Sequence, residues 1–309
     1  MPAIALSLAC APVVLVTGAT GNVGSALVHR LVADNRRPVR ALVRDPRRLG
    51  PDRVRVQIAL GDLSDASSFR HALRGVRTVV HLAAAIRDQQ RQGATIEEVN
   101  ALGTLRLVRA AERAGVERFI FFSAIGASLH SQSRFFRAKA QAEVAVEEAD
   151  MQTTVVSPSI IYSPSDPWIT LLGRLAVLPV VPISGRGRAV YEPIWAQDVA
   201  AAVVALLEQD GSGERHRRLE LAGPERLSYE EIVRTYLRAR HRRRRLLHVP
   251  LPVVRWGLKA VEEVQGSLAF ATWDEAELME IPMVSRRGTA DAKSLGVHPL
   301  AMQQVLGTR

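Results

Sequence analysis

The residues most clearly spaced for chemistry form a glycine-rich turn near the N-terminus. Gly18, Gly21 and Gly24 follow the apolar run 13–16 and open an amphipathic segment, the strand, turn and helix order of a dinucleotide-binding motif. Gly18 permits a tight turn, Gly21 lets backbone N–H groups approach a pyrophosphate, and Gly24 lets the helix lie close to the sheet. The free N–H groups and positive dipole end of that helix favour the anion. We therefore predict a dinucleotide site at Gly18, Thr20, Gly21, Asn22, Val23 and Gly24.

The end of the second predicted strand bears on which dinucleotide is bound. This strand, 39–43, runs directly into Arg44. An acid at this point accepts hydrogen bonds from a ribose 2′-OH, whereas an arginine pairs with a 2′-phosphate. Asp45 comes one residue later, where an extended chain points its side chain to the opposite face. We expect Arg44 to select NADP(H), with NAD(H) as the alternative.

Composition describes a globular chain with an excess of arginine. The 309 residues are 47% hydrophobic with a mean hydropathy of +0.03, enough for one large or two unequal domains. The 41 Lys and Arg against 31 Asp and Glu give a formal charge of +10. The arginines are dispersed, apart from a dense run at 238–245. No aromatic residues interleave that run, so we do not expect nucleic-acid binding. Contact with an anionic membrane surface stays open.

Cysteine usage and segment lengths bear on compartment and metal binding. Cys10 is alone, which excludes an intrachain disulfide and a cysteine metal cluster and favours a reducing compartment. Residues 1–11 lack a basic n-region, so we interpret them as a short extension rather than a signal peptide. No run reaches the ~20 apolar residues of a membrane-spanning helix. No histidine pair has zinc-binding spacing. We expect a cytoplasmic protein without metal, with peripheral membrane association as the alternative.

Apolar strands alternate with helical patterns through the first half of the chain, which predicts an α/β fold with a Rossmann-type, doubly wound parallel sheet. Further strands are predicted at 54–59, 77–82, 119–123 and 153–157. A helix over 96–114 presents an apolar stripe of Val99, Leu102, Leu105, Leu107 and Val108.

The pattern becomes less regular after residue 164. We predict a core helix over 198–208, a short strand at 220–222, and a helix with Ser228 as N-cap and Glu231 at the capping-box position. The predicted organisation is a dinucleotide-binding domain at 11–165, to which 189–222 returns, and a smaller C-terminal α/β substrate-side domain formed by 166–188 and 223–309.

Polar and small residues follow several of the predicted strands. Asp62 and Leu63 follow the third strand, where a carboxylate can accept from an adenine amino group, and Ala83 and Ala84 follow the fourth, where small residues let a cofactor approach the backbone. Three more chemically notable residues are Asn100, Ser123 and Lys139. In this order the set resembles the extended and atypical short-chain dehydrogenase/reductase superfamily.

The resemblance implies an active site with one departure. In that superfamily a Ser, a Tyr and a Lys four residues after the Tyr act together. The Tyr hydroxyl transfers the proton that accompanies hydride transfer, and the Lys lowers the pKa of the Tyr and holds the nicotinamide ribose. Ser123 and Lys139 match as catalytic candidates, Lys139 also as a cofactor ligand, but Phe135 stands at the Tyr position. A phenyl ring has no ionisable proton, and loss of a general acid typically costs about 100- to 10,000-fold in rate.

Later motifs narrow the resemblance. Residues 156–166, which include the cofactor-binding candidate Pro158, are similar to the family segment that closes over the nicotinamide, although Ser157 and Ser163 stand where an Arg and a Gly are usual. Residues 191–200 and 221–229 add two more matches. The set resembles bacterial relatives of the NAD(P)H-binding accessory subunit of respiratory complex I, with NmrA-like redox-sensing regulators as cousins. This subset often binds NADPH without demonstrated turnover.

Two hypotheses about function follow. In the first, NADP(H) is a structural or sensory ligand of a protein that assists assembly of a membrane-bound quinone complex, as Phe135 favours. In the second, the chain is an NAD(P)-dependent oxidoreductase, epimerase or isomerase on a small or isoprenoid-type substrate, with a non-standard proton donor. Candidate donors are Ser131, Ser133, Tyr162 and Lys139. The apolar segment 171–183, with Trp168 and Trp195, is interpreted as the lining of a pocket for a small apolar substrate or as ordinary core.

Overall fold

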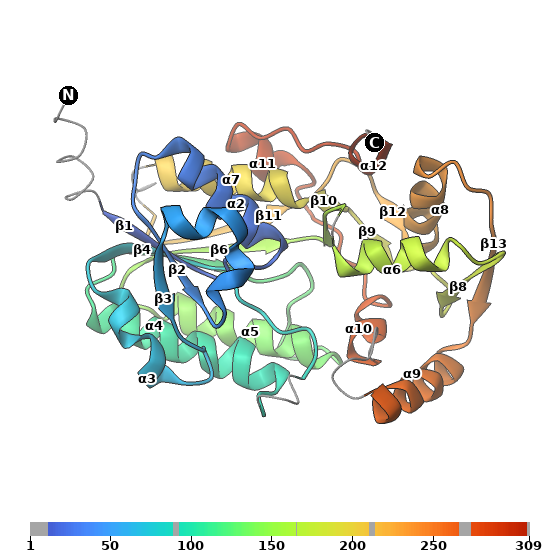
Figure 1. Ribbon diagram of the computed structural model, residues 1–309, viewed down its shortest axis with the longest axis horizontal. Coiled ribbons are helices and arrows are strands. Elements are labelled where there is room, and N and C mark those ends of the chain that lie inside the picture. The colour runs from blue at the N-terminus through green and yellow to red at the C-terminus, as the bar shows by residue number, and fades with distance from the viewer. Residues whose placement is uncertain (1–11, 89–92, 165, 210–213, 266–272, 308–309) are drawn as a thin grey trace.

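A computed structural model describes residues 12–88, 93–164, 166–209, 214–265 and 273–307. Its centre is a seven-stranded parallel sheet in the order β11-β6-β5-β4-β1-β2-β3, with helices on both faces (Figure 1). The strands are β1 (Val13–Thr17), β2 (Val39–Val43), β3 (Gln57–Leu60), β4 (Val76–His81), β5 (Arg118–Phe122), β6 (Gln152–Pro158) and β11 (His216–Leu221). The predicted Rossmann-type α/β fold is confirmed.

The strands are apolar on both sides because both faces of the sheet are covered. In β1, Val14 and Val16 pack in the cluster that contains α2 (Asn22–Asp34) and α7 (Ala196–Glu208). Leu15, between them, packs in the cluster formed with α4 (Gly103–Arg113) and α5 (Arg134–Glu147). Alternating side chains therefore anchor different helix layers, as the period of two in a strand requires.

Two predicted elements differ in detail. The third strand begins later than predicted, because Val54 belongs to the 3-10 segment Pro46–Arg55, which is interrupted by a kink at Gly50, and is 82% exposed. The helix predicted over 96–114 contains a π-turn, Glu98–Leu102, before α4. The predicted stripe is confirmed for Val99, Leu107 and Val108, which are buried. It was wrong for Leu102 and Leu105, which are exposed, since Ala111 completes the sheet-facing side of α4 with Leu107 and Val108.

The second half of the chain returns to the sheet after an excursion. After β6 come β7 (Ile161–Tyr162), α6 (Pro167–Leu175), β8 (Val180–Ser184), β9 (Val190–Tyr191) and β10 (Ile194–Trp195). Then α7 packs near α2, and β11 pairs with β6. The core helix predicted over 198–208 is confirmed as part of α7, and the strand predicted at 220–222 is the end of the longer β11. The limits of the two predicted domains stay a prediction.

Smaller elements lie beyond the carboxyl ends of the strands (Figure 1). They are β12 (Leu227–Ser228), α8 (Tyr229–Ala239), β13 (Arg245–Val249), α9 (Leu251–Gln265), α10 (Trp273–Leu278) and α12 (Met302–Gly307), while α11 (Ala290–Ser294) packs near β11 and α3 (Ala66–Phe69) follows β3. The predicted capping box opens α8: Ser228 Oγ accepts from Glu231 N at 3.2 Å, and the Glu231 carboxylate accepts from Ser228 N at 2.7 Å.

The apolar segment 171–183 is divided between core and surface. Leu172, Val181 and Ile183 are buried in a cluster that also receives Trp168 and Trp195, whereas Val177 and Leu178 are exposed. Among the described residues no helix is long and apolar enough to cross a membrane. Residues 1–11, including Cys10, lie outside the described part of the chain.

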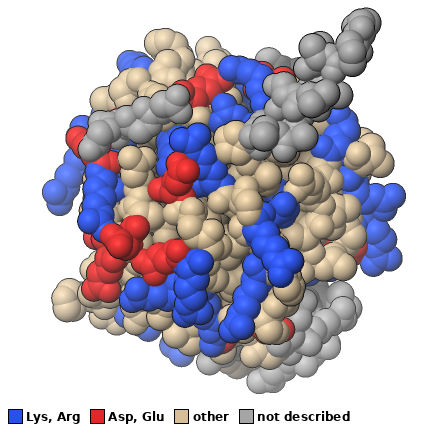
Figure 2. Space-filling view, turned by 90° about the vertical axis from the view of Figure 1, so that its left-hand side faces the viewer, with Lys and Arg blue, Asp and Glu red and all other residues tan. Residues whose placement is uncertain are grey.

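Arginines on the face shown in Figure 2 are interspersed with acidic and uncharged side chains. At the amino ends of the strands, Arg77 pairs with Glu117 at 2.6 Å, and Arg118 donates to the carbonyl of Leu206 at 2.9 Å. Arg77 and Arg118 therefore make contacts within the protein at this edge.

Candidate dinucleotide site

The glycine turn lies between β1 and α2 at the carboxyl edge of the sheet. Gly21 is the N-cap of α2, and its N–H donates to the carbonyl of Gly18 at 3.0 Å. The next residues, Asn22, Val23 and Gly24, form the first turn of the helix, whose backbone N–H groups have no partner within the helix. Thr20 lies in the turn itself and is half-buried. This is the local arrangement that binds a pyrophosphate.

Two of the three glycines are required by packing. Gly18 has φ +68°, and a Cβ there would lie 2.6 Å from the backbone nitrogen of Ala83. A Cβ on Gly24 would lie 2.0 Å from the carbonyl oxygen of Gly18, which no side chain can tolerate. Gly21 differs, because its Cβ would lie 3.3 Å from that oxygen and the residue is exposed. The conformation of the turn therefore requires glycine at positions 18 and 24, whereas Gly21 leaves the solvent-facing side of the turn accessible.

Arg44 and Asp62 meet at the ends of β2 and β3. The guanidinium of Arg44 lies 3.7 Å from the Asp62 carboxylate, and the Arg44 side chain is 45% exposed. Asp62 also accepts from the N–H and hydroxyl of Ser64, at 2.9 and 2.8 Å. The Asp45 carboxylate instead accepts from the backbone N–H of Arg47 at 3.0 Å and caps the 3-10 segment. Arg44, directly after β2, therefore lies beside an acid that follows the neighbouring strand β3.

A buried chain of hydrogen bonds supports the turn from below. Thr104 Oγ1 donates to the carbonyl of Asn100 at 2.6 Å, so it must accept from His81 Nε2, which lies 2.9 Å away. His81 Nδ1 then accepts from the Thr17 hydroxyl at 2.6 Å. Burial, with a smaller contribution from Lys139, lowers the pKa of His81 to about 3, which keeps the ring neutral. These hydrogen bonds fix the position of Thr17, the last residue of β1, relative to Thr104 on α4.

The small residues after β4 lie against the turn. The N–H of Ala83 points toward the Thr17 hydroxyl at 3.4 Å, Ala84 is exposed, and Ala85 exchanges two hydrogen bonds with the buried amide of Asn100, at 3.0 and 2.7 Å. Leu63 is buried against Gly103. Asn100 therefore shapes the loop that faces the predicted cofactor.

Ser123 and Lys139 come together at the end of β5. The Lys139 ammonium donates to the carbonyl of Phe122 at 2.7 Å, and the Ser123 hydroxyl donates to the Glu143 carboxylate. The Phe135 ring, one turn earlier on α5, has its centroid 5.8 Å from Lys139 Nζ and packs against Phe136. Burial lowers the pKa of Lys139 to about 7, an effect that Glu143 opposes.

Some of these partners were not found from the sequence. Glu143 binds both Ser123 and Arg218, whose guanidinium lies 2.9 Å from the Glu143 carboxylate. Its position four residues after Lys139 on the same helix was the available signal. Asp166 caps α6 by accepting from the N–H of Trp168 at 2.7 Å and also accepts from the side-chain amide of Asn22. Burial raises the pKa of Asp166. No sequence pattern indicated this bond between α6 and the glycine turn.

Pro158 and an ionic cluster of Asp88, Glu97 and Arg134 lie at the ends of the strands β4, β5 and β6 or in the parts of the chain that follow them. Pro158 is the last residue of β6 and accepts from the N–H of Ile125 at 2.9 Å. Arg134, at the start of α5, pairs with Asp88 at 3.0 Å and with Glu97 at 2.7 Å. The arginine lowers the pKa of Glu97 to about 2. This ionic cluster ties the segment before α4 to the helix that carries Phe135 and Lys139.

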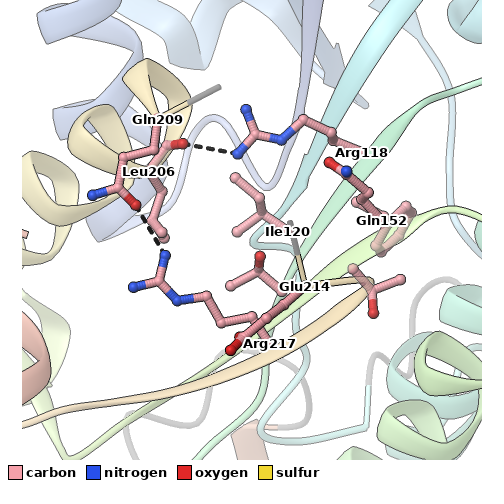
Figure 3. A pocket seen from close by; sticks show the side chains of 10 residues that line it. Arg118, Ile120, Gln152, Leu206, Gln209, Glu214 and Arg217 are labelled. Carbon is pink, nitrogen blue, oxygen red and sulfur yellow. Dashed lines mark hydrogen bonds between the residues drawn. The ribbon is translucent and has the colours of Figure 1, made fainter. Parts of the chain in front are cut away.

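A small hollow lies at the opposite edge of the sheet (Figure 3). Arg118, Gln152 and Arg217 line it at the amino ends of β5, β6 and β11, and Arg217 donates to Gln209 at 2.9 Å. Its cavity volume of about 10 Å³ has room for about one water molecule. It is too small for a nucleotide and lies away from the glycine turn. Over the described ranges, no cluster of His, Cys, Asp and Glu is arranged to hold a metal.

A family model described as NAD(P)H-binding matches residues 18–210, which include the glycine turn and the strands β2 to β6. The chain belongs to this NAD(P)H-binding family. Among similar proteins, subunit 9 of the NADH dehydrogenase (ubiquinone) 1 alpha subcomplex, mitochondrial, of Arabidopsis thaliana is 30% identical over 253 residues, which are 79% of this chain and 61% of that protein. Ceramide reductase of Caulobacter vibrioides is 32% identical over 243 residues, 78% of this chain and 74% of that protein.

Solved structures agree with this membership at the level of the fold. A nucleoside-diphosphate-sugar epimerase from Staphylococcus aureus superposes with a TM-score of 0.74 at 20% identity, covering 95% of this chain and 99% of its own. A UDP-glucose 4-epimerase from Thermus thermophilus in complex with NAD gives 0.70 at 19%, covering 96% of each chain. This NAD(P)H-binding protein is thus an atypical member of the short-chain dehydrogenase/reductase superfamily, related to complex I subunits.

Proposed function

We propose that the chain holds NADP(H) as a structural or sensory ligand and does not turn it over by the usual proton-coupled carbonyl chemistry of its superfamily. The observation that carries the proposal is the position of Phe135. Its ring occupies the place next to Lys139 where a tyrosine hydroxyl would act, and packs against Phe136 and neighbouring apolar side chains. A hydrocarbon ring supplies no proton to a substrate oxygen.

The other two catalytic candidates also support this proposal. The hydroxyl proton of Ser123 is donated to Glu143, and Glu143 is itself held by Arg218. That donor is therefore engaged within the protein and is not directed at a substrate carbonyl. Lys139 donates to the carbonyl of Phe122, at the point where β5 ends. In the proposal both residues shape the nicotinamide end of the site, and Lys139 binds the cofactor.

The proposal assigns the remaining cofactor contacts by their place at the sheet edge. The pyrophosphate lies at the turn of α2, Asp62 and Leu63 face the adenine end, and Ala83, Ala84 and Pro158 face the nicotinamide half. Arg44 pairs with the 2′-phosphate, so we propose NADP(H) as the preferred form. When bound, the cofactor supplies a group that can donate or accept a hydride.

The names of the relatives suggest a setting for such a protein. Subunits of mitochondrial NADH dehydrogenase from Arabidopsis thaliana and mouse are among them. We propose by analogy that this chain assists assembly of a membrane-bound quinone complex, with the nucleotide stabilising its fold. The match covers 61% of the Arabidopsis protein, so this chain spans only part of that protein's length.

A second function is favoured by one observation. Burial brings the pKa of Lys139 to about 7, so its ammonium can exchange a proton near neutral pH. Relatives named ceramide reductase and sterol demethylase protein B suggest a lipidic substrate for a reductase of this kind. In this alternative Lys139 replaces the missing tyrosine as proton donor.

A hydride-transfer assay separates the two functions. NADPH-loaded protein is mixed with quinones, aldehydes and long-chain ketones, and the absorbance of NADPH is followed against free NADPH. The proposal predicts no acceleration over free NADPH for any acceptor. Acceleration that disappears in Lys139→Met, while nucleotide stays bound, assigns the reductase function instead.

A further inference from the structure

β8, β13 and α9 lie at one end of the molecule (Figure 1). These elements, and the residues directly after α6, carry exposed apolar side chains. Trp256 is 77% exposed and Val177 is 65% exposed. We call this surface the β8–β13 patch, and its members are Val177, Leu178, Val180, Pro182, Leu247, Val253 and Trp256.

The strand register places three of these side chains on one face. In the parallel pair of β8 and β13, Val180 is the partner of Arg245 and Pro182 is the partner of Leu247. Partner residues in a ladder point to the same side of the ribbon. Val181 and Ile183, which alternate with them, are buried. The outer face of the ribbon is therefore apolar with a basic edge, and α9 follows it directly after Pro250.

The members of the patch lie in two stretches of the chain that contain no acidic residue, and Glu262 and Glu263 follow the second stretch in the last part of α9. Residues 167–191 hold three Arg and no Asp or Glu, and residues 232–261 hold eight Arg and one Lys and no Asp or Glu. The whole chain has 31 acidic residues, so this is a segregation of charge. Glu230, on α8 beside β13, is paired with His248 at 2.9 Å and with Arg234 at 2.6 Å.

The arginine run is fixed to the patch by the end of α6. Arg242 and Arg244 both donate to the carbonyl of Ala176, each at 3.1 Å, where α6 ends. Cationic donors at this end of a helix complement its dipole. Arg243 and Arg245, which alternate with them, are exposed. The run therefore presents positive charge beside Val177 and Leu178 in a defined position.

We propose that the β8–β13 patch docks on the surface of a lipid bilayer that contains anionic phospholipids. Apolar side chains with a tryptophan enter the boundary between headgroups and acyl chains, and arginines beside them attract anionic headgroups. An apolar face beside exposed arginines distinguishes between the possible partners. Nucleic acid would bind the arginines but not the apolar face. A second copy of the patch would bury the apolar face but bring like charges together. The protein lies on the membrane in this arrangement and does not cross it.

Vesicle flotation of the full chain tests the proposal. We expect binding to vesicles of phosphatidylcholine with phosphatidylglycerol, weak binding to phosphatidylcholine alone, and loss of binding as salt is raised. Arg243→Glu/Arg245→Glu and, separately, Trp256→Ser should each reduce binding at least about tenfold, because the first replaces two attractive charges by two repulsive ones and the second removes the anchoring ring. Arg70→Glu/Arg74→Glu, which makes the same charge change on the opposite part of the molecule, should bind like the native chain.

Three results would overturn the proposal. The first is no flotation of the native chain with anionic vesicles. The second is an equal loss in the Arg70→Glu/Arg74→Glu control, which would indicate a response to net charge only. The third is a dimer in sedimentation that dissociates in Trp256→Ser, which would assign the patch to self-association. Circular dichroism of every variant excludes loss of folding as the cause.

Discussion

The centroid of the Phe135 ring lies 5.8 Å from Nζ of Lys139, one turn along the same helix. This pair keeps the spacing of a tyrosine and lysine that move a proton, but the ring carries no hydroxyl. The lysine has instead a buried ammonium whose pKa is about 7 and whose hydrogen bond goes to the backbone of Phe122. In the proposed function, this pair keeps the position of the lysine but has no hydroxyl to act as proton donor.

Restoring the hydroxyl is the first prediction. Phe135→Tyr should confer NADPH-dependent reduction of carbonyl compounds, because Lys139 beside the new phenol stabilises its anion and lowers its pKa. The gain should be roughly 100-fold over the native chain, the lower end of what a general acid contributes. Steady-state oxidation of NADPH measures it. The double variant Phe135→Tyr/Lys139→Met should lose the gain, and native activity equal to that of Phe135→Tyr would contradict the assignment.

Exchanging single glycines for alanine should separate folding from binding. Gly24→Ala should lower the free energy of unfolding by about 3 kcal/mol or more, because its Cβ would overlap the Gly18 carbonyl. Gly21→Ala should cost about 1 kcal/mol or less, since its Cβ has space, yet should weaken NADPH binding about tenfold or more by blocking the pyrophosphate. Denaturant titration and calorimetric binding measure the two effects. Equal stability of the two variants would refute this division of roles.

Cofactor preference should depend on Arg44. Arg44→Gln should weaken NADPH binding about 10- to 100-fold, the effect of one charged hydrogen bond, and leave NADH binding nearly unchanged. The matched control is Arg47→Gln, because Arg47 is engaged with Asp45 in the next turn. Fluorescence titration with both cofactors checks this. A parallel loss for NADPH and NADH would show that Arg44 does not read the 2′-phosphate.

Acid should destabilise the fold through His81. Its pKa is about 3 when folded and near the ordinary 6.5 when unfolded, so between these values the unfolded chain binds a proton that the native chain does not. Stability is therefore fully present above about pH 6.5 and falls by about 1.4 kcal/mol for each pH unit as the pH drops toward 3.

Denaturant titrations over that pH window compare the native chain with two variants. His81→Gln should reduce stability at neutral pH and flatten its dependence on acid. His29→Gln, at an exposed histidine, should keep the native slope. If the free energy of unfolding of His81→Gln depends on pH as steeply as that of the native chain, the titrating group lies elsewhere.

The parts of the fold that depend on local spacing could be predicted. The glycine turn, the strand at 39–43 and the capping box of Ser228 were readable because each depends on neighbours within a few residues. Val54 and Leu105 were assigned incorrectly because both are apolar residues whose burial depends on the tertiary contacts of the segment. A hydrophobic pattern alone does not contain that information.

The side-chain partners within the site were not predictable in the same way. Ser123 could be placed from its motif, but its bond to Glu143 and the chain from His81 to Thr104 join residues about twenty positions apart. Asp166 and Asn22 are farther apart still and meet because the chain leaves the sheet and returns to its edge. Such contacts follow from topology.

The most direct test of the central claim is to identify the nucleotide that the protein carries and how firmly it is held. The native chain is purified, denatured, and the released nucleotide identified by mass spectrometry, while a second portion is incubated with isotopically labelled NADPH and with quinones and carbonyl compounds. We predict NADPH that co-purifies, exchanges slowly and is not oxidised. Freely exchanging nucleotide that any of these acceptors oxidises would contradict a structural or sensory role and establish a working reductase.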